Sequence, residues 1–296
     1  METKKDSKEL LDDIKGLFDI LKDKRSMHEA EWQDVCTYIG SNVFDWSENK
    51  AEIKRPKRHT GRPSEYLKKL VSGLMGYTIS PNVTWLKLSL NNTEMIEYAG
   101  VKDWLEQSEK ALYEEFNRNN LYSQVSLFIS NAASFGHGVM LIDEKKENSI
   151  RFLTIAEPEI YIAENEYGDI DTVFRYFSMT VKNIIARFGE ENVSEQIKND
   201  AKDIKGKNKE IKILHAVLPR DDYDESKLDG KNMEFASYYI DMDNNMILEE
   251  SGYYELPYSV FVWEKETSSA YGGSPAREAI PDMRLLNKVE EARLKL

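Results

Sequence analysis

Three aspartates in the last third of the chain are the side chains whose type and spacing best fit metal-dependent chemistry. Asp221, Asp222 and Asp224 lie in one short stretch, and carboxylate oxygens are the ligands that Mg²⁺ prefers in phosphoryl-transfer sites. The same stretch holds Lys227 and Gly230 and is followed by no second acidic motif. We therefore interpret it as a solvated loop, and a magnesium-dependent nuclease is kept only as an alternative.

Other patterns that would bind a metal or a phosphate are incomplete. None of the four histidines has a partner at the spacing of a zinc site. Residues 241–245 copy the first half of a calcium loop, but Met246 replaces the glycine of its sharp turn, so we predict a turn between two strands. Ala276 stands where a phosphate-binding loop carries its lysine. The sequence therefore predicts no enzyme, no cofactor and no metal site.

One segment, residues 49–63, is strongly basic. It holds a single acid, Glu52, and six cations: Lys50, Lys54, Arg55, Lys57, Arg58 and Arg62. Several cations on one loop can contact successive phosphates, so a DNA-binding adaptor that works through residues 50–62 is a second alternative. The other interpretation is a loop that docks on an acidic neighbouring subunit, which the acidic balance of the whole chain favours.

Composition sets the broad class of the protein. The chain has 296 residues, 41% of them hydrophobic and 31% charged, with a formal net charge of −13. This length fits about two domains, or one domain with a long extension, and this charge excludes nucleic-acid binding through bulk attraction. The only cysteine, Cys36, excludes an internal disulfide and is expected to be a buried apolar filler. No apolar run reaches membrane-spanning length, so we expect no membrane contact and a cytosolic compartment.

Hydrophobic spacing predicts the elements that must position these residues. Helices are predicted at 10–21, 27–39, 64–80, 101–118, 122–134 and 181–188. Strands are predicted at 85–90, 139–143, 150–155, 170–177, 211–218, 235–241, 246–250 and 258–263. The charged interval 198–212 is predicted to be a solvated connector. Helices first and antiparallel strands later are typical of an α+β fold.

The tryptophans and the C-terminal segment complete these predictions. Core packing is expected for Trp32, Trp46, Trp85, Trp104 and Trp263. Ser274 is a suitable helix N-cap, with Pro275 at the first helical position. The final amphipathic segment, 282–296, has no Gly or Asn cap and no Pro after it, so we expect the helix to continue in a longer protein.

Short segments along nearly the whole chain carry a resemblance to a known family. The matching residues are Trp85 after Ser80 and Pro81, Trp104 within 101–105, Gly136 and Gly138 within 135–138, 179–180 leading to 187–189, 214–220, Pro257 within 250–258, Tyr271, Gly272, Ser274 and Pro275 within 271–276, and Asp282 and Asn287 within 281–287. Each segment consists of turn and packing residues, so their common order and spacing count more than any one of them. In this order they resemble the head-to-tail connector, or portal, family of short-tailed bacteriophages.

This resemblance implies a structural role. The family forms a ring of identical subunits, typically a dodecamer, at one capsid vertex, and double-stranded DNA passes through its channel during packaging and ejection. It implies contacts with a separate terminase motor and with scaffold and tail adaptor proteins, and a location in the virion, with the host cytoplasm as the site of assembly. Residues 1–270 would be an α+β wing-like region and 271–296 a turn and the start of a stem-like helix, with the clip and remaining C-terminal parts absent.

Overall fold

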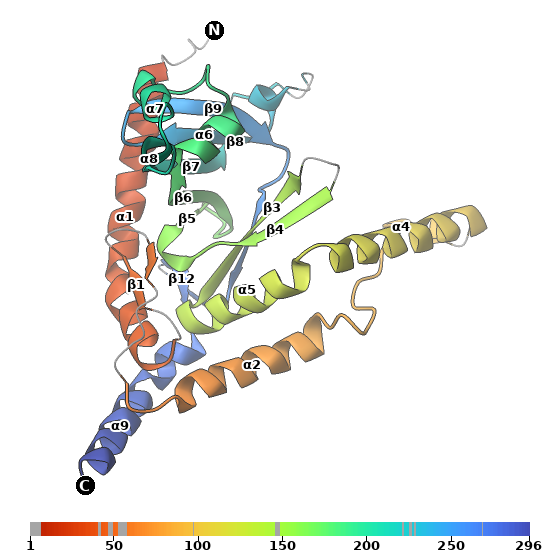
Figure 1. The fold of residues 1–296 in the computed structure, drawn as a ribbon. Coiled ribbons are helices and arrows are strands. Elements are labelled where there is room, and N and C mark those ends of the chain that lie inside the picture. Colours follow the sequence, from red (N-terminus) through yellow and green to blue (C-terminus); the bar gives the residue numbers. More distant parts are fainter. Residues whose placement is uncertain are drawn as a thin grey trace.

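The computed structural model describes residues 7–40, 43–46, 50–52, 58–96, 98–145, 149–220, 222–224, 227, 229–267 and 269–296. A long N-terminal helix lies along a five-stranded antiparallel sheet, and a three-stranded sheet shares a hydrophobic core with it. Further helices form an arm that reaches away from the sheets, and the last helix leaves the body in another direction (Figure 1). The predicted α+β class is confirmed.

The N-terminal helix α1 (Ser7–Tyr38) is continuous, so the prediction of two separate helices is wrong. Residues 22–26 contain no Gly or Pro, and nothing in them ends a helix. Arg25 occupies the buried face of α1 in place of an apolar residue. Its guanidinium lies 3.9 Å from the ring centre of Tyr161 and donates hydrogen bonds to the carbonyl oxygens of Pro158 (2.6 Å) and Ile160 (3.3 Å). A buried cation therefore interrupts the apolar pattern without interrupting the helix.

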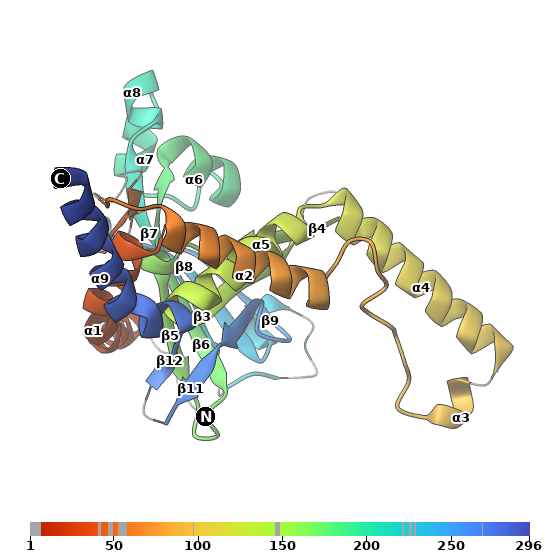
Figure 2. The same cartoon turned by 90° about the horizontal axis from the view of Figure 1, so that it is seen from below.

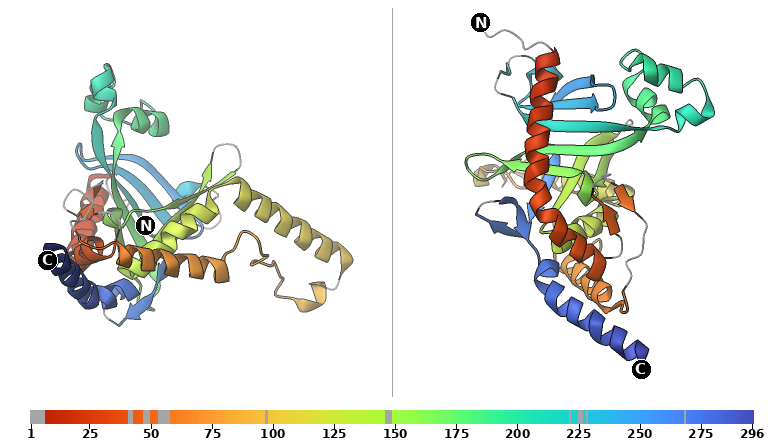
Figure 3. Two further views of the ribbon diagram at one scale, coloured as in Figure 1. Left: turned by 60° about the horizontal axis from the view of Figure 1, so that its bottom comes forward. Right: turned by 90° about the vertical axis from the view of Figure 1, so that its left-hand side faces the viewer.

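The five-stranded sheet has the order β5 (Ile160–Glu164), β6 (Ile170–Thr180), β7 (Glu210–Pro219), β8 (Phe235–Asp241) and β9 (Met246–Tyr253), with every neighbouring pair antiparallel. One group of its side chains packs with Phe18 and the rest of the apolar face of α1. The right-hand view of Figure 3 shows α1 running across the strands of this sheet. Another group packs with α6 (Val181–Phe188) and α7 (Glu195–Asp200). The predicted strands at 170–177, 211–218 and 235–241 are confirmed.

The predicted connector 198–212 is more structured than expected. It contains the end of α7 and the short helix α8 (Ile204–Lys207), and β7 begins at Glu210. Ser194 caps α7 by accepting a hydrogen bond from the amide of Ile197 (3.3 Å), whose side chain is buried. Most of the interval is nevertheless exposed.

The three-stranded sheet has the order β10 (Tyr258–Val262), β3 (His137–Lys145) and β4 (Ser149–Thr154), and helix α5 (Leu121–Phe135) packs against it. The 3-10 turn η1 (Glu157–Glu159) links this sheet to the larger one, and η2 (Gly230–Asn232) precedes β8. Two small hairpins complete the strands: β1 (Val43–Asp45) with β2 (Lys50–Glu52), and β11 (Glu264–Glu266) with β12 (Ser269–Gly273).

The arm consists of α2 (Arg62–Thr78), α3 (Thr93–Ile96) and α4 (Ala99–Arg118), and α4 extends well beyond both sheets (Figure 2). The predicted strand at 85–90 is wrong. The amides of Trp85 and Leu86 both donate to the hydroxyl of Tyr113 (2.7 Å each), and the amide of Leu88 donates to Glu109 (2.7 Å). Side chains of α4 thus accept the backbone hydrogen bonds of an extended segment whose alternating apolar pattern had predicted a strand in a sheet.

Trp104 also departs from prediction. Its side chain is 59% exposed, because it lies on the outer side of α4 while the next residue, Leu105, is the buried one. Trp85 is partly buried and stacks on Phe116 with ring centres 5.6 Å apart. The expectation of core packing is therefore wrong for Trp104.

The last helix, α9 (Pro275–Lys295), begins at the predicted cap and includes Pro281 within it. Three of its large apolar side chains are exposed: Leu285, Val289 and Leu294. In the part of the chain that the structure describes, no helix is both long and apolar enough to cross a membrane.

Candidate functional site

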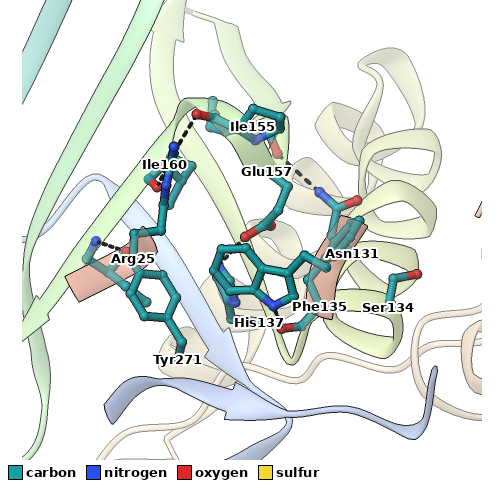
Figure 4. Close-up of polar contacts among 12 residues, drawn as sticks. Arg25, Asn131, Ser134, Phe135, His137, Ile155, Glu157, Ile160 and Tyr271 are labelled. Atoms are coloured by element: carbon teal, nitrogen blue, oxygen red, sulfur yellow. Dashed lines mark hydrogen bonds and ion pairs between the residues drawn. The ribbon is translucent and has the colours of Figure 1, made fainter. Parts of the chain in front are cut away.

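The two motifs 135–138 and 271–275 meet in the structure, although more than one hundred residues separate them in the sequence. The first joins α5 to β3, and the second joins β12 to α9. Trp32 of α1 and Glu157 of η1 contact the same place. We call this region, where residues 134–138 and 271–277 meet Arg25, Trp32 and the η1 turn, the junction (Figure 4).

Two glycines allow the backbones of the junction to approach each other. Gly136 has a φ of 90°, and a Cβ on it would overlap the carbonyl oxygen of Gly272. A Cβ on Gly272 would lie 2.6 Å from the carbonyl oxygen of Glu264. The carbonyl oxygen of Gly136 in turn accepts a hydrogen bond from the amide of Trp263 (2.8 Å). Both positions therefore require glycine for steric reasons.

Ser274 attaches the start of α9 to the end of α5. Its buried hydroxyl donates to the carbonyl oxygen of Ser134 (2.9 Å) and accepts a hydrogen bond from the amide of Arg277 (3.1 Å). The predicted N-cap is confirmed, and the same oxygen satisfies a carbonyl at the end of another helix. Pro275 follows as the first residue of α9.

Aromatic side chains fill the junction. The ring of Tyr271 lies 5.0 Å from that of His137 and 5.3 Å from that of Trp32, centre to centre. The hydroxyl of Tyr271 accepts a hydrogen bond from the amide of Ile162 (3.3 Å), and burial raises the pKa of Tyr271. Trp32 donates its indole hydrogen to the carbonyl oxygen of Phe135 (3.1 Å). Helix α1, both sheets and the start of α9 are therefore held by one set of rings.

A buried histidine–glutamate contact lies beside these rings. His137 Nε2 is 2.6 Å from Glu157 Oε1, and the two side chains are 0% and 2% exposed. Arg25 holds the η1 turn from its other side through its bonds to Pro158 and Ile160. Removing either member of such a pair leaves a polar or charged group buried without its partner. The sequence analysis missed Glu157 and Arg25, because a single acid and a single cation in distant segments form no motif.

Helix α9 is also held by residues outside the junction. Arg277 forms ion pairs with Glu31 (2.7 Å) and Glu266 (2.8 Å), and Arg284 pairs with Asp34. Asn287 accepts a hydrogen bond from the amide of His59 (2.8 Å). These contacts tie α9 to α1 and to the segment before α2.

Except for Gly138, the other family-motif residues lie outside the junction. Gly138 lies on β3 against α5, where a Cβ would be 2.7 Å from the carbonyl oxygen of Phe128. Pro257 is buried, and its carbonyl oxygen accepts a hydrogen bond from the amide of Ile142 (2.9 Å). Trp85 and Trp104 belong to the arm, and Asp282 is exposed on α9.

Only part of the basic segment lies within the described residues. Lys54, Arg55 and Lys57 lie outside the described residues. Arg58 donates to the carbonyl oxygen of Gly40 (2.7 Å) and to the hydroxyl of Ser64 (2.6 Å), and partial burial lowers its pKa. Arg58 thus links the end of α1 to the start of α2, whereas Arg62 is exposed.

The described acidic residues form no metal site. Asp222 is exposed, Asp224 pairs with Lys227 (3.2 Å), and Asp221 lies outside the described residues. Over the described ranges, no group of three or more His, Cys, Asp or Glu side chains is arranged to hold a metal ion.

The calcium-like segment, residues 241–245, is a hairpin turn, as predicted. Asp241 accepts hydrogen bonds from the amides of Asp243 and Asn244 (3.0 Å each).

The single cysteine, Cys36, is buried in the core, and burial raises its pKa to about 12. Its interpretation as an apolar filler is confirmed.

Comparison with known proteins gives a consistent result. Residues 11–296 match the family described as bacteriophage head to tail connecting protein. The chain is 30% identical over 279 residues to the portal protein of Salmonella phage epsilon15, covering 92% of this chain and 50% of that protein. It is 26% identical over 271 residues to the probable portal protein of Bordetella phage BPP-1, covering 90% of this chain and 49% of that protein.

The chain thus spans about half the length of these curated relatives. The junction joins two of the motifs on which the resemblance rests, and the family match includes both. The chain belongs to the bacteriophage head-to-tail connecting protein family.

Proposed function

We propose that this chain is the wing-like part and the beginning of the stem of a portal subunit, which forms a ring around a DNA channel at one capsid vertex. The family match over residues 11–296, together with 30% identity to a portal protein, carries this proposal. The family is a structural one of the phage head-tail junction, in line with the prediction that the chain is not an enzyme.

The shape of the subunit supports assembly. Helices α4 and α9 both extend away from the packed body (Figures 1 and 2). Trp104 on α4 and Leu285 on α9 are 59% and 63% exposed. Large apolar side chains on protruding helices are typical of surfaces that a partner covers. Identical subunits placed side by side in a ring would cover such surfaces.

The junction supports a division between residues 1–270 and 271–296. It attaches the start of α9 rigidly to the sheets, while the second half of the helix leaves them (Figure 1). In this proposal α9 leads into the stem, and the clip belongs to the part of the relatives that the match does not cover. Terminase motor, scaffold and tail adaptor proteins would dock on the assembled ring, with the host cytoplasm as the site of assembly and the virion as the final location.

The acidic balance of the chain suits a DNA channel. With a formal charge of −13, the subunit surface repels a polyanion on average, so DNA in the channel would meet few deep binding minima. The adaptor alternative relies on the basic segment. Its cation Arg58 is engaged within the subunit, which weakens that alternative.

The mass of the assembled full-length protein tests the proposal. Native mass spectrometry and electron microscopy are expected to show closed rings, with a dodecamer as the specific expectation. A full-length protein that stays monomeric under assembly conditions, with no rings in micrographs, would contradict the proposal. Neutralising Lys54, Arg55, Lys57 and Arg58 distinguishes the portal proposal from the adaptor alternative. An adaptor would lose the salt dependence of its DNA binding.

A further inference from the structure

A lysine-lined cleft lies on helices α6, α7 and α8, at one end of the five-stranded sheet. The cavity has a volume of about 500 Å³, and its lining includes four lysines and two glutamates: Lys182, Lys198, Lys202, Lys207, Glu190 and Glu195. Lys198 pairs with Glu195 (2.8 Å). For Lys182 and Lys207, the described part of the chain offers no ion pair within 4.0 Å. The cleft therefore holds excess positive charge in a protein that is acidic overall.

The cleft also has an apolar part. Ile185 and Ala201 belong to its lining and are partly buried. A ligand that fits both parts must carry negative charge and an apolar group. A phosphate backbone offers only the first, whereas a protein segment can offer both.

A segment of this kind lies at the opposite end of the same sheet. The turn between β5 and β6 exposes two carboxylates, Glu166 and Asp169, and between them Tyr167, which is 82% exposed. Asn165 accepts hydrogen bonds from the amides of Tyr167 (3.0 Å) and Asp169 (2.9 Å), so the turn is held in one shape. We call residues 165–169 the acidic tip.

Strand β6 separates the tip from the cleft. It begins directly after the tip, at Ile170, and ends at Thr180, where α6 follows. Its eleven residues span about 36 Å at the usual rise of a strand. The right-hand view of Figure 3 shows the tip and helices α6 to α8 on opposite sides of the molecule, and Figure 2 agrees. The subunit therefore presents complementary surfaces at its two ends.

We propose that the acidic tip of one subunit docks in the lysine-lined cleft of the next subunit. This inference rests on the proposed ring, because a ring interface joins two different surfaces of identical chains. The carboxylates of Glu166 and Asp169 face the lysines of the cleft, and Tyr167 packs on its apolar part. An aromatic residue flanked by charges is a common anchor at protein interfaces.

Charge reversal in the full-length protein tests this contact. The cleft variant carries Lys182→Glu and Lys207→Glu, and the tip variant carries Glu166→Lys and Asp169→Lys. Each variant alone is expected to lose ring formation, with assembly weakened about tenfold or more at low salt. A mixture of the two monomers is expected to recover rings, because every interface again joins opposite charges. One chain that carries all four substitutions should recover as well.

The controls separate this contact from folding and from the ring itself. Lys22→Glu with Lys24→Glu reverses two exposed lysines of α1 and should leave assembly unchanged, and circular dichroism checks that every variant is folded. If the cleft and tip variants form rings as well as the wild type, the contact is wrong and the ring proposal stands. If the mixture fails to recover, the pairing is wrong. If cleft variants assemble normally but lose DNA binding, the cleft is a nucleic-acid site and our inference is overturned.

Discussion

The junction and the arm differ in how far one subunit completes them. At the junction, the family-motif residues Gly136, Tyr271, Gly272 and Ser274 are buried, and each contacts another part of the same chain. On the arm, Trp104 belongs to a similar motif but lies mostly in solvent. Residues of similar motif status therefore differ in burial: those of the junction pack within the subunit, whereas the side chain of Trp104 does not.

The largest expected effect on stability is at the close approach of Gly136 and Gly272 in the junction. Gly136→Ala places a Cβ against the carbonyl oxygen of Gly272 at a positive φ, and we expect unfolding free energy to fall by about 4 kcal/mol. Urea denaturation measures this. Gly16→Ala on the exposed face of α1 has no atom within 4 Å of its Cβ and should raise stability by about 0.5 to 1 kcal/mol. Equal effects at Gly136 and Gly16 would contradict the claim that the junction requires glycine at position 136 for steric reasons.

The buried contact between His137 and Glu157 should come next. Glu157→Ala leaves His137 buried without its partner, and we expect a loss of about 3 kcal/mol. Adding His137→Phe should restore part of this loss, because the unpartnered group is then gone. A double-mutant cycle measures the coupling between the two residues. Strictly additive losses would show that the pair does not act as a unit.

A pH effect on stability is expected from a buried histidine in the five-stranded sheet. His215 is buried, with Nδ1 2.7 Å from the Tyr258 hydroxyl and Nε2 3.0 Å from that of Ser237. Burial, together with Arg187 and Arg175, lowers its pKa well below 6.5. The unfolded chain therefore takes up a proton below pH 6.5 while the folded chain does not.

Folding stability should consequently be unaffected by this group above pH 6.5 and should fall as the pH drops below that value. The loss from His215 is about 2 kcal/mol between pH 6.5 and pH 5. Stability measured against pH for wild type and His215→Gln gives this contribution as the difference in slope. Parallel curves for wild type and His215→Gln would contradict the assignment.

A smaller loss is expected at the cap of α9. Ser274→Ala removes the hydroxyl that accepts from Arg277 and donates to Ser134, so we expect a loss of about 1 to 2 kcal/mol. Ser26→Ala removes an exposed hydroxyl that donates to the carbonyl oxygen of Asp23 in its own helix and should change stability by less than about 0.5 kcal/mol. Thermal unfolding of both variants is the measurement. Similar small changes for both would mean that the start of α9 is not fixed by Ser274.

The smallest effect on folding is expected on the arm. Trp104→Ala should change the unfolding free energy by less than about 0.5 kcal/mol, because the side chain is largely exposed. Trp85→Ala removes a ring stacked on Phe116 and should cost about 3 kcal/mol. Urea denaturation of the two variants compares them directly. A large loss for Trp104→Ala would show that the arm is completed within the subunit after all.

Helix and strand predictions succeeded where hydrophobic spacing reflects burial within one element. Strands β6 to β8 and the cap at Ser274 were predicted, because alternation and capping chemistry are local. The break expected in α1 was wrong, because Arg25 occupies a core position that is normally apolar. The strand expected at 85–90 was wrong, because Tyr113 and Glu109 satisfy its amides from another helix.

The sequence by itself determined the family and the α+β class, and it excluded a recognisable catalytic pattern. Periodicity and capping depend on residues that are near each other in the chain, and the order and spacing of the family motifs can be read along the chain without knowing which segments meet in the fold. Only the tertiary structure decided that residues 135–138 and 271–275 form one junction, that His137 meets Glu157, and that an acidic tip and a lysine-lined cleft occupy opposite ends of one sheet. These pairings join segments far apart in the chain, so they are created by the folding of the backbone and leave no local pattern.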